Sequence, residues 1–186
     1  GHAAQGGGFG YVNALSRFIK AYPDKVKVFT DTQAVSLIKD EQGRVIGVDG
    51  KNDGKTIKFF ASKGVIIATG GFGSNVDFRQ AKNTGVWKEV KLDKDIPCTN
   101  NFKASQGDGL KLAEQVGANI IDLDDIQLHP GGTPKTGIMS SWPSGRNRIF
   151  LTPQGDRFVN EDAARDTLCK AIFKEGGKYW IVSNHV

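Results

Sequence analysis

Cysteine is scarce in this sequence, which has only Cys98 and Cys169 among its 186 residues. Neither belongs to a CxxC pair or to a cluster with histidine, so the spacing indicates no zinc site. We expect two free, partly buried thiols rather than a disulfide. Cysteine usage therefore leaves the redox compartment undecided.

Long hydrophobic runs and blocks of one charge are also missing. No apolar run approaches the roughly 20 residues that a helix needs to span a bilayer, and no signal peptide is visible. The 25 basic residues are mixed with 20 acidic ones, without a basic block that contains aromatics, which argues against nucleic-acid binding. The net charge of +5 favours a small anionic substrate or a phosphate-bearing cofactor.

The chain begins with Gly1 rather than methionine, which predicts a processed, trimmed or engineered piece. Its length suits one domain, or one domain with part of another. Glycine is abundant, at 24 residues. The opening stretch, GHAAQGGGFG, is a glycine-rich loop that leads into a helix, because the apolar residues that follow recur at helical spacing. These are Phe9, Val12, Leu15, Phe18 and Ile19, and Tyr22-Pro23-Asp24 ends the helix. Such a loop can bind an anion or form only a tight turn.

Short stretches with strand character come next. They are Val26 to Thr30, Gln33 to Asp40, Arg44 to Gly50 and Lys55 to Ser62. The connections DEQG and KNDG are typical of hairpins. We predict an antiparallel three-stranded meander.

Gly64 to Asn75 reads GVIIATGGFGSN, and its apolar run predicts a strand buried on both faces of a parallel sheet. The run leads into Thr69, Gly70 and Gly71, and ligands sit at the carboxyl ends of such strands. A helix is predicted over Gly107 to Ala118. Asp108 at its start is either a helix cap or a ligand contact.

The rest of the chain is predicted from local patterns. We expect partial helix over 76–94, a loop over 96–105, a hairpin of Arg148 to Thr152 with Asp156 to Asn160, a helix over Glu161 to Phe173, and a strand over Lys178 to Ser183. A domain boundary is predicted near Leu123.

Five motifs in order resemble the fumarate reductase and succinate dehydrogenase flavoprotein superfamily, and its soluble fumarate and urocanate reductase branch in particular. They are ATGGFGSN, GDGLKLAEQVGA, IQLHP, GRNRIF and GDRFVNEDAARD. The resemblance implies an α/β fold with α+β character: residues 1–122 form the central part of a Rossmann-like FAD-binding domain with a β-meander, and residues 123–186 form part of an inserted capping (clamp) domain. The substrate site would lie between them, over the flavin.

The resemblance also implies roles for individual residues. In this family, hydride passes from the flavin to one carbon of a C=C bond, and an arginine delivers a proton to the other. That arginine matches Arg165, and His129 matches a histidine that contacts a substrate carboxylate. From its sequence context alone, Arg165 is an arginine held by Glu161, Asp162 or Asp166. The family's FAD contacts match Gly6, Gly7, Gly8, Ala34, Val35, Thr69, Gly70, Gly71 and Asp108.

The sequence departs from the family at the predicted substrate site. Ser140 or Ser141 stands where fumarate reductases carry a glutamate, and Ser144 stands near an arginine of the same proton path. A hydroxyl cannot replace that charge network without water. Together with Gly7, these serines are the predicted substrate-binding residues, and Trp142 indicates either a larger unsaturated substrate or a packed aromatic. The N-terminal GxGxxG unit and the family's C-terminal part are also missing, so we expect this chain alone to bind FAD weakly or not at all.

The sequence is compatible with three functions. The first is an FAD-dependent reductase of unsaturated carboxylates, supplied with electrons by a haem or FMN domain or protein. The second is a dehydrogenase of the same superfamily, of the ketosteroid or tricarballylate type. The third is a non-catalytic binding module on the same scaffold.

Overall fold

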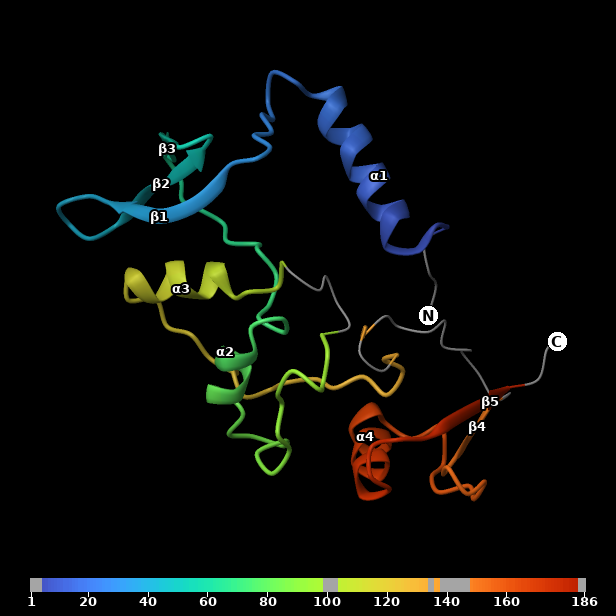
Figure 1. The fold of residues 1–186 in the computed structure, drawn as a ribbon. Helices are drawn as coiled ribbons and strands as arrows, with labels where there is room; N and C mark the ends of the chain where they lie inside the picture. Colours follow the sequence, from blue (N-terminus) through green and yellow to red (C-terminus); the bar gives the residue numbers. More distant parts are fainter. Residues whose placement is uncertain (1–4, 99–103, 134–135, 138–147, 184–186) are drawn as a thin grey trace.

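The computed structural model describes residues 5–98, 104–133, 136–137 and 148–183, and Figure 1 shows their arrangement. The fold mixes helices and strands, as predicted. The elements in chain order are α1 (Gly7–Ala21), β1 (Gln33–Lys39), β2 (Val45–Asn52), β3 (Lys55–Phe60), α2 (Val76–Ala81), α3 (Asp108–Gln115), β4 (Arg148–Leu151), α4 (Arg165–Lys174) and β5 (Trp180–Ser183). None of these helices is long and apolar enough to cross a membrane.

The predicted meander is confirmed. Strands β1, β2 and β3 pair antiparallel in sequence order, so β1 is an edge strand. The register shifts between Ala34 and Ser36, which leaves Val35 as an extra residue with no partner on β2. Such a bulge bends an edge strand and frees its backbone groups from the ladder.

The predicted strand at Val26 to Thr30 is wrong, because this segment pairs with no strand in the described part of the chain. The carbonyls at the end of this segment and just after it are bound by a side chain instead. Asn52 Nδ2 donates to the carbonyls of Thr30 and Asp31, at 3.3 and 3.0 Å. These bonds fix an irregular loop, in which Asp31 has a φ of 53°.

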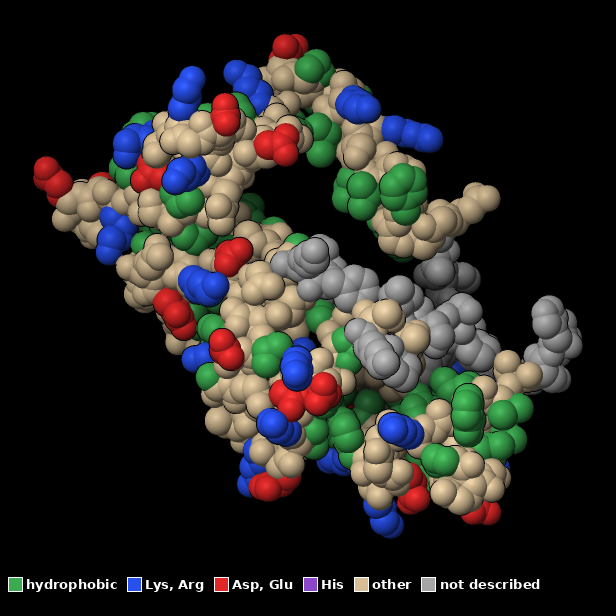
Figure 2. Space-filling view, viewed as in Figure 1, with side chains coloured by type: hydrophobic (Ala, Val, Ile, Leu, Met, Phe, Trp, Pro, Cys, Tyr) green, Lys and Arg blue, Asp and Glu red, His purple; other side chains and the backbone are tan. Residues whose placement is uncertain are grey.

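The predicted first helix is confirmed as α1, which begins after Gly6 with a φ of 83°. Its apolar face is not buried by the described residues: Phe9, Val12, Leu15 and Phe18 are all more than half exposed. Figure 2 shows uncovered hydrophobic side chains on the surface of α1.

The prediction of a buried parallel strand within Gly64 to Asn75 is also wrong for the described residues. The segment has no strand partner, and Ile66 is 92 % exposed. A strand forms only where a neighbour accepts its backbone hydrogen bonds, and the pairs formed by the described strands are all antiparallel. The segment instead packs on the predicted helix, confirmed as α3, through Gly109. A β-carbon on Gly109 would overlap Thr69 Oγ1 and lie 2.5 Å from Ile67 Cγ2, so only glycine allows this approach.

The C-terminal part is built differently from the predicted hairpin. A turn at Pro153 to Gly155 is present, closed by the Thr152 amide donating to the Asp156 carbonyl at 2.8 Å. However, β4 pairs along its length with β5, and only one bridge joins Leu151 to Arg157. The other edge of β4 is occupied because the Phe150 amide donates to the Glu161 carboxylate at 2.8 Å. The predicted helix and last strand are confirmed as α4 and β5, with later starting points.

Two clusters of buried apolar residues join separate parts of the chain. One joins Trp87 and Leu92 to Cys169 of α4, with Ile126 and Leu128 packed against them. The other joins Phe150 to Leu168 and Ile172. The first cluster links residues on both sides of Leu123, and the domain boundary there stays a prediction. Cys98 and Cys169 are both thiols rather than a disulfide, as expected, and burial raises the pKa of Cys169 to about 11.

Candidate functional site

The Thr69–Gly71 turn and the start of α3 form the first half of the candidate site. The Gly107 amide donates to the Gly71 carbonyl at 3.1 Å, and Gly107 has a φ of 75°. Asp108 makes no capping hydrogen bond, since Gly107 is the N-cap residue. Its carboxylate instead pairs with Lys111 Nζ at 3.3 Å. The structure therefore brings Thr69, Gly71 and Asp108 together.

The space around this turn suits a bulky ligand. A β-carbon on Gly70 or Gly71 would meet no atom of the described residues within 4 Å, and Gly70 has a φ of 77°. Helix α3 also contacts β1, the strand that carries Ala34 and the bulged Val35 (Figure 1). An edge strand with unpaired backbone groups can hydrogen-bond a purine edge, and open glycines let a flat ring approach the backbone. These residues fit the FAD that the family motifs imply.

The glycines at the start of α1 are not brought to this group. A β-carbon on Gly7 or Gly8 would also meet no atom within 4 Å. However, α1 contacts none of the other helices and strands of the described residues. The role of Gly6, Gly7 and Gly8 stays a prediction.

Arg165 and His129 form the second half of the candidate site. Arg165 is the first residue of α4, and its Nη1 donates to Gln127 Oε1 at 3.4 Å. His129 is half-buried, and burial lowers its pKa, with a further lowering by the charge of Arg165. His129 Nδ1 accepts the Gly131 amide at 3.0 Å, so a neutral imidazole carries its proton on Nε2. The structure therefore brings Arg165, His129 and Gln127 into one neighbourhood.

The loop before Arg165 is fixed by a buried carboxylate that the sequence did not single out for this role. Glu161 is 5 % exposed and accepts from Arg157 Nη2 at 2.6 Å and Nε at 3.1 Å. These bonds, aided by the Phe150 amide, lower the pKa of Glu161 to about 2. Glu161 thus holds Arg157 and leaves Arg165 to Gln127.

No role was predicted for Gln127, although the sequence contains a signal for it. Gln127 and His129 are separated by one residue, a spacing that places two side chains on the same side wherever a backbone is extended. The predicted substrate residues Ser140, Ser141 and Ser144, with Trp142, lie outside the described residues.

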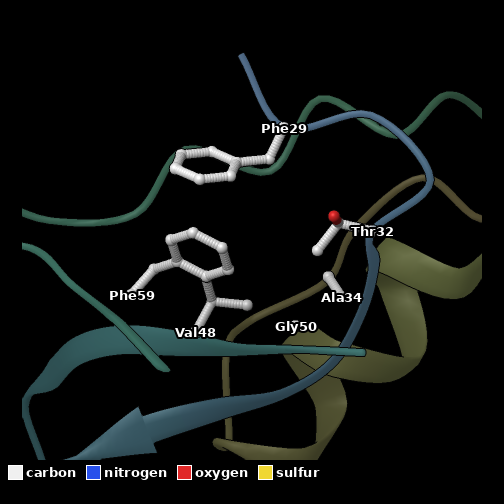
Figure 3. Close-up of a pocket in the computed structure, with 6 residues that line it drawn as sticks. All are labelled: Phe29, Thr32, Ala34, Val48, Gly50 and Phe59. Atoms are coloured by element: carbon white, nitrogen blue, oxygen red, sulfur yellow. The ribbon is translucent and has the colours of Figure 1, made fainter. Parts of the chain in front are cut away.

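Two hollows adjoin these groups. One, of about 230 Å³, lies on the meander (Figure 3). Phe29 and Phe59, whose ring centroids are 4.8 Å apart, line it, and Ala34 forms part of its wall. The other, of about 280 Å³, reaches Gln127 and is walled by Trp87 and Asp166. In the described part of the chain, no group of three or more His, Cys, Asp or Glu side chains could hold a metal ion.

Comparison with known proteins finds reductases of the family that the sequence motifs resemble. The chain is 34% identical over 180 residues to an NADH:acrylate oxidoreductase of Vibrio harveyi, covering 95% of this chain and 17% of the relative. It is 39% identical over 152 residues to a urocanate reductase of Eggerthella lenta, covering 79% of this chain and 24% of the relative. It is 31% identical over 171 residues to a cytochrome-type fumarate reductase of Shewanella frigidimarina, covering 90% of this chain and 27% of the relative. The chain thus spans about a quarter or less of these relatives' lengths.

Solved structures agree. A flavocytochrome c3 fumarate reductase in its open conformation superposes with a TM-score of 0.70 at 27% identity, over 97% of this chain and 31% of the other. A 3-ketosteroid dehydrogenase from Rhodococcus jostii superposes with a TM-score of 0.58 at 20% identity, over 94% of this chain and 33% of the other, which supports the fold alone. The resemblance inferred from the motifs is confirmed, and so is FAD as the cofactor of the family. Because residues 2–185 match the sequence model described as FAD binding domain, the chain belongs to that family.

Proposed function

We propose that this chain is part of an FAD-dependent oxidoreductase that reduces the C=C bond of an unsaturated carboxylate. The observation that carries this proposal is the shared neighbourhood of Arg165 and His129, in which the charge of one acts on the other. Acrylate, urocanate and fumarate, the substrates in the relatives' names, all carry a C=C bond conjugated to a carboxylate.

The two side chains offer complementary chemistry to such a substrate. The His129 imidazole, held through Nδ1 by the Gly131 amide, presents Nε2–H as a donor to a carboxylate oxygen. The Arg165 guanidinium adds a positive charge, which favours an anionic substrate. The hydrogen bond from Arg165 to Gln127 orients the guanidinium.

Arg165 is the proposed proton donor. FAD, when bound and reduced, would supply a hydride to one carbon of the C=C bond. Arg165 gives a proton to the other carbon, so that the double bond becomes a CH–CH single bond. Because an arginine side chain has a pKa of about 12.5 or more, the neutral form is short-lived and regains its proton from a relay that leads to solvent.

The cofactor half of the proposal rests on α3 and its neighbours. Thr69, Gly70, Gly71 and Asp108 would line the flavin side, and the bulged edge of β1 at Ala34 and Val35 would meet the adenine. Since the pyrophosphate cradle of such folds is the first βα turn, the 186-residue chain alone should bind FAD weakly. Titration of this chain with FAD checks this, and tight stoichiometric binding would contradict it.

The substrate is proposed to differ from fumarate. Ser140, Ser141 and Ser144 stand where the family's charged proton path is expected, and Trp142 favours a larger molecule. Electrons would come from a haem or FMN domain or protein.

The test is a substrate panel for the full-length protein with a reduced dye as the electron source. We expect oxidation of the dye with one or more unsaturated carboxylates and faster turnover of urocanate-like or acrylate-like compounds than of fumarate. Failure to reduce any of them, while a ketosteroid or tricarballylate is oxidised in a parallel assay with an oxidised dye as electron acceptor, would contradict the proposal.

A further inference from the structure

A buried arginine lies behind the proposed flavin turn, and neither the motifs nor the proposed mechanism uses it. Arg79 of α2 is only 6 % exposed. Its guanidinium binds four main-chain carbonyls of two separate segments, Gly73 and residues 92–96. Nε donates to Leu92 at 2.8 Å, Nη1 donates to Gly73 at 2.8 Å, and Nη2 donates to Ile96 at 2.6 Å and also to Asp93.

This arrangement is costly as a source of stability. Burial lowers the pKa of Arg79, which shows that the charge loses hydration. Among the described residues, no carboxylate forms an ion pair with Arg79, and the Asp93 carboxylate pairs with Lys91 at 3.1 Å. A buried guanidinium satisfied by neutral carbonyls contributes defined geometry more than net stability.

The geometry that Arg79 fixes is that of the glycine turn. Gly73 follows directly on the Thr69–Phe72 segment, and its other side is closed because a β-carbon there would lie 2.8 Å from Cys98 Sγ. The next residues are tied to the segment before α3: the Ser74 amide donates to the Ser105 carbonyl at 2.9 Å, and Asn75 Nδ2 donates to the Gln106 carbonyl at 3.1 Å.

We propose that Arg79 is a positioning residue for FAD: by holding the Gly73 carbonyl, it sets the Gly70–Gly71 turn at the distance that the flavin requires. This inference rests on the proposed function, in which that turn lines the flavin. A lysine would keep the positive charge but cannot span four carbonyls, because its ammonium is a single point with three donors.

The next residue along the chain provides a matched control. Gln80 Oε1 accepts the Leu92 amide at 2.7 Å, so it ties α2 to the same 92–96 segment without a hydrogen bond to Gly73. Gln80→Met therefore loosens that segment while leaving the glycine turn in place.

The experiment is FAD titration of the full-length apoprotein, with the visible spectrum of the bound flavin as a second readout. We expect Arg79→Lys to raise the Kd for FAD at least about tenfold, as expected for lost hydrogen bonds to a charged group, and to shift the flavin bands. Gln80→Met should lower thermal stability but leave the Kd and the spectrum unchanged. If Arg79→Lys leaves both readouts unchanged, or if Gln80→Met changes them equally, the positioning role is wrong.

A second variant covers the case in which Arg79→Lys does not fold. Gly73→Ala pushes the turn away from Cys98 while Arg79 is retained, and it should also raise the Kd for FAD. An unchanged Kd in a folded Gly73→Ala protein would overturn the inference. Wild-type protein that binds no FAD at all would instead overturn the proposed function.

Discussion

Arg165 and His129 lie far apart in the sequence, yet the charge of Arg165 acts on the imidazole of His129. Burial lowers the pKa of His129, and the guanidinium of Arg165 lowers it further. At neutral pH the imidazole is therefore neutral and can donate from Nε2, because Nδ1 accepts the Gly131 amide. This relationship joins the 126–129 segment to the start of α4 and underlies the proposed chemistry.

Removing the guanidinium charge should raise the pKa of His129. In Arg165→Gln, the part of the lowering that comes from the charge is lost and the part that comes from burial remains. NMR titration of the imidazole C–H signals measures this, with His129→Gln to assign the resonance. Lys174→Gln removes another exposed cation of α4 and should leave the pKa unchanged. An unchanged pKa of His129 in Arg165→Gln would show that the charge of Arg165 does not act on this imidazole.

The same lowering has a consequence for stability. The folded-state pKa of His129 lies below the unfolded value of about 6.5, so the unfolded state binds the proton more readily. The free energy of unfolding therefore falls as the pH drops through and below this value. In His129→Gln, the part of this fall in stability that comes from His129 should be absent. Denaturant melts at pH 7.5 and pH 5 measure the difference.

Two glycines near α3 should respond differently to alanine, one with a loss of stability and one with almost no change. Gly109→Ala forces a β-carbon onto Thr69 Oγ1, and we expect a loss of about 1–3 kcal/mol of stability, as for overpacking elsewhere. Gly71→Ala meets no atom within 4 Å, so its stability should change by less than about 0.5 kcal/mol.

FAD binding should distinguish the same two variants. If the flavin approaches the open side of Gly71, Gly71→Ala raises the Kd for FAD in the full-length protein although the fold is intact. Urea melts of the apoprotein and FAD titration measure the two effects separately. Unimpaired FAD binding by Gly71→Ala would move the flavin away from this turn.

The Glu161–Arg157 pair predicts acid sensitivity. The pKa of Glu161 is lowered to about 2, first by the hydrogen bonds from Arg157. Its stabilising contribution is therefore present above the unfolded pKa of about 4.3 and lost as the pH falls through 2. Because Arg157 is exposed, solvent screens the pair and reduces this contribution. Glu161→Gln should flatten the stability profile between pH 5 and pH 2, whereas Asp162→Asn should not.

Local sequence patterns were sufficient for the elements whose partners are close in sequence. The meander follows from alternation and short turns, and α1, α3 and α4 follow from helical spacing. The β4–β5 pair could not be predicted in this way, because the edge of β4 next to Arg157 is taken by a side chain, Glu161. That exchange of a backbone partner for a carboxylate leaves no periodic signal.

The candidate site was predicted mainly by its motifs. Thr69, Gly71 and Asp108 meet at α3 because Gly109 allows close packing, which the glycine-rich sequence hints at but does not specify. Gln127 was predictable from its spacing to His129. Arg79 was not, since a single arginine in a polar stretch gives no sign that it is buried against four carbonyls.

The most direct test of the account is the steady-state rate of full-length Arg165→Ala with FAD bound. If Arg165 donates the proton, kcat for the unsaturated carboxylate falls about 10²- to 10⁴-fold, while FAD content and thermal stability stay near wild type and Lys174→Ala keeps full activity. A flavin-loaded Arg165→Ala enzyme that turns over at the wild-type rate would contradict the account.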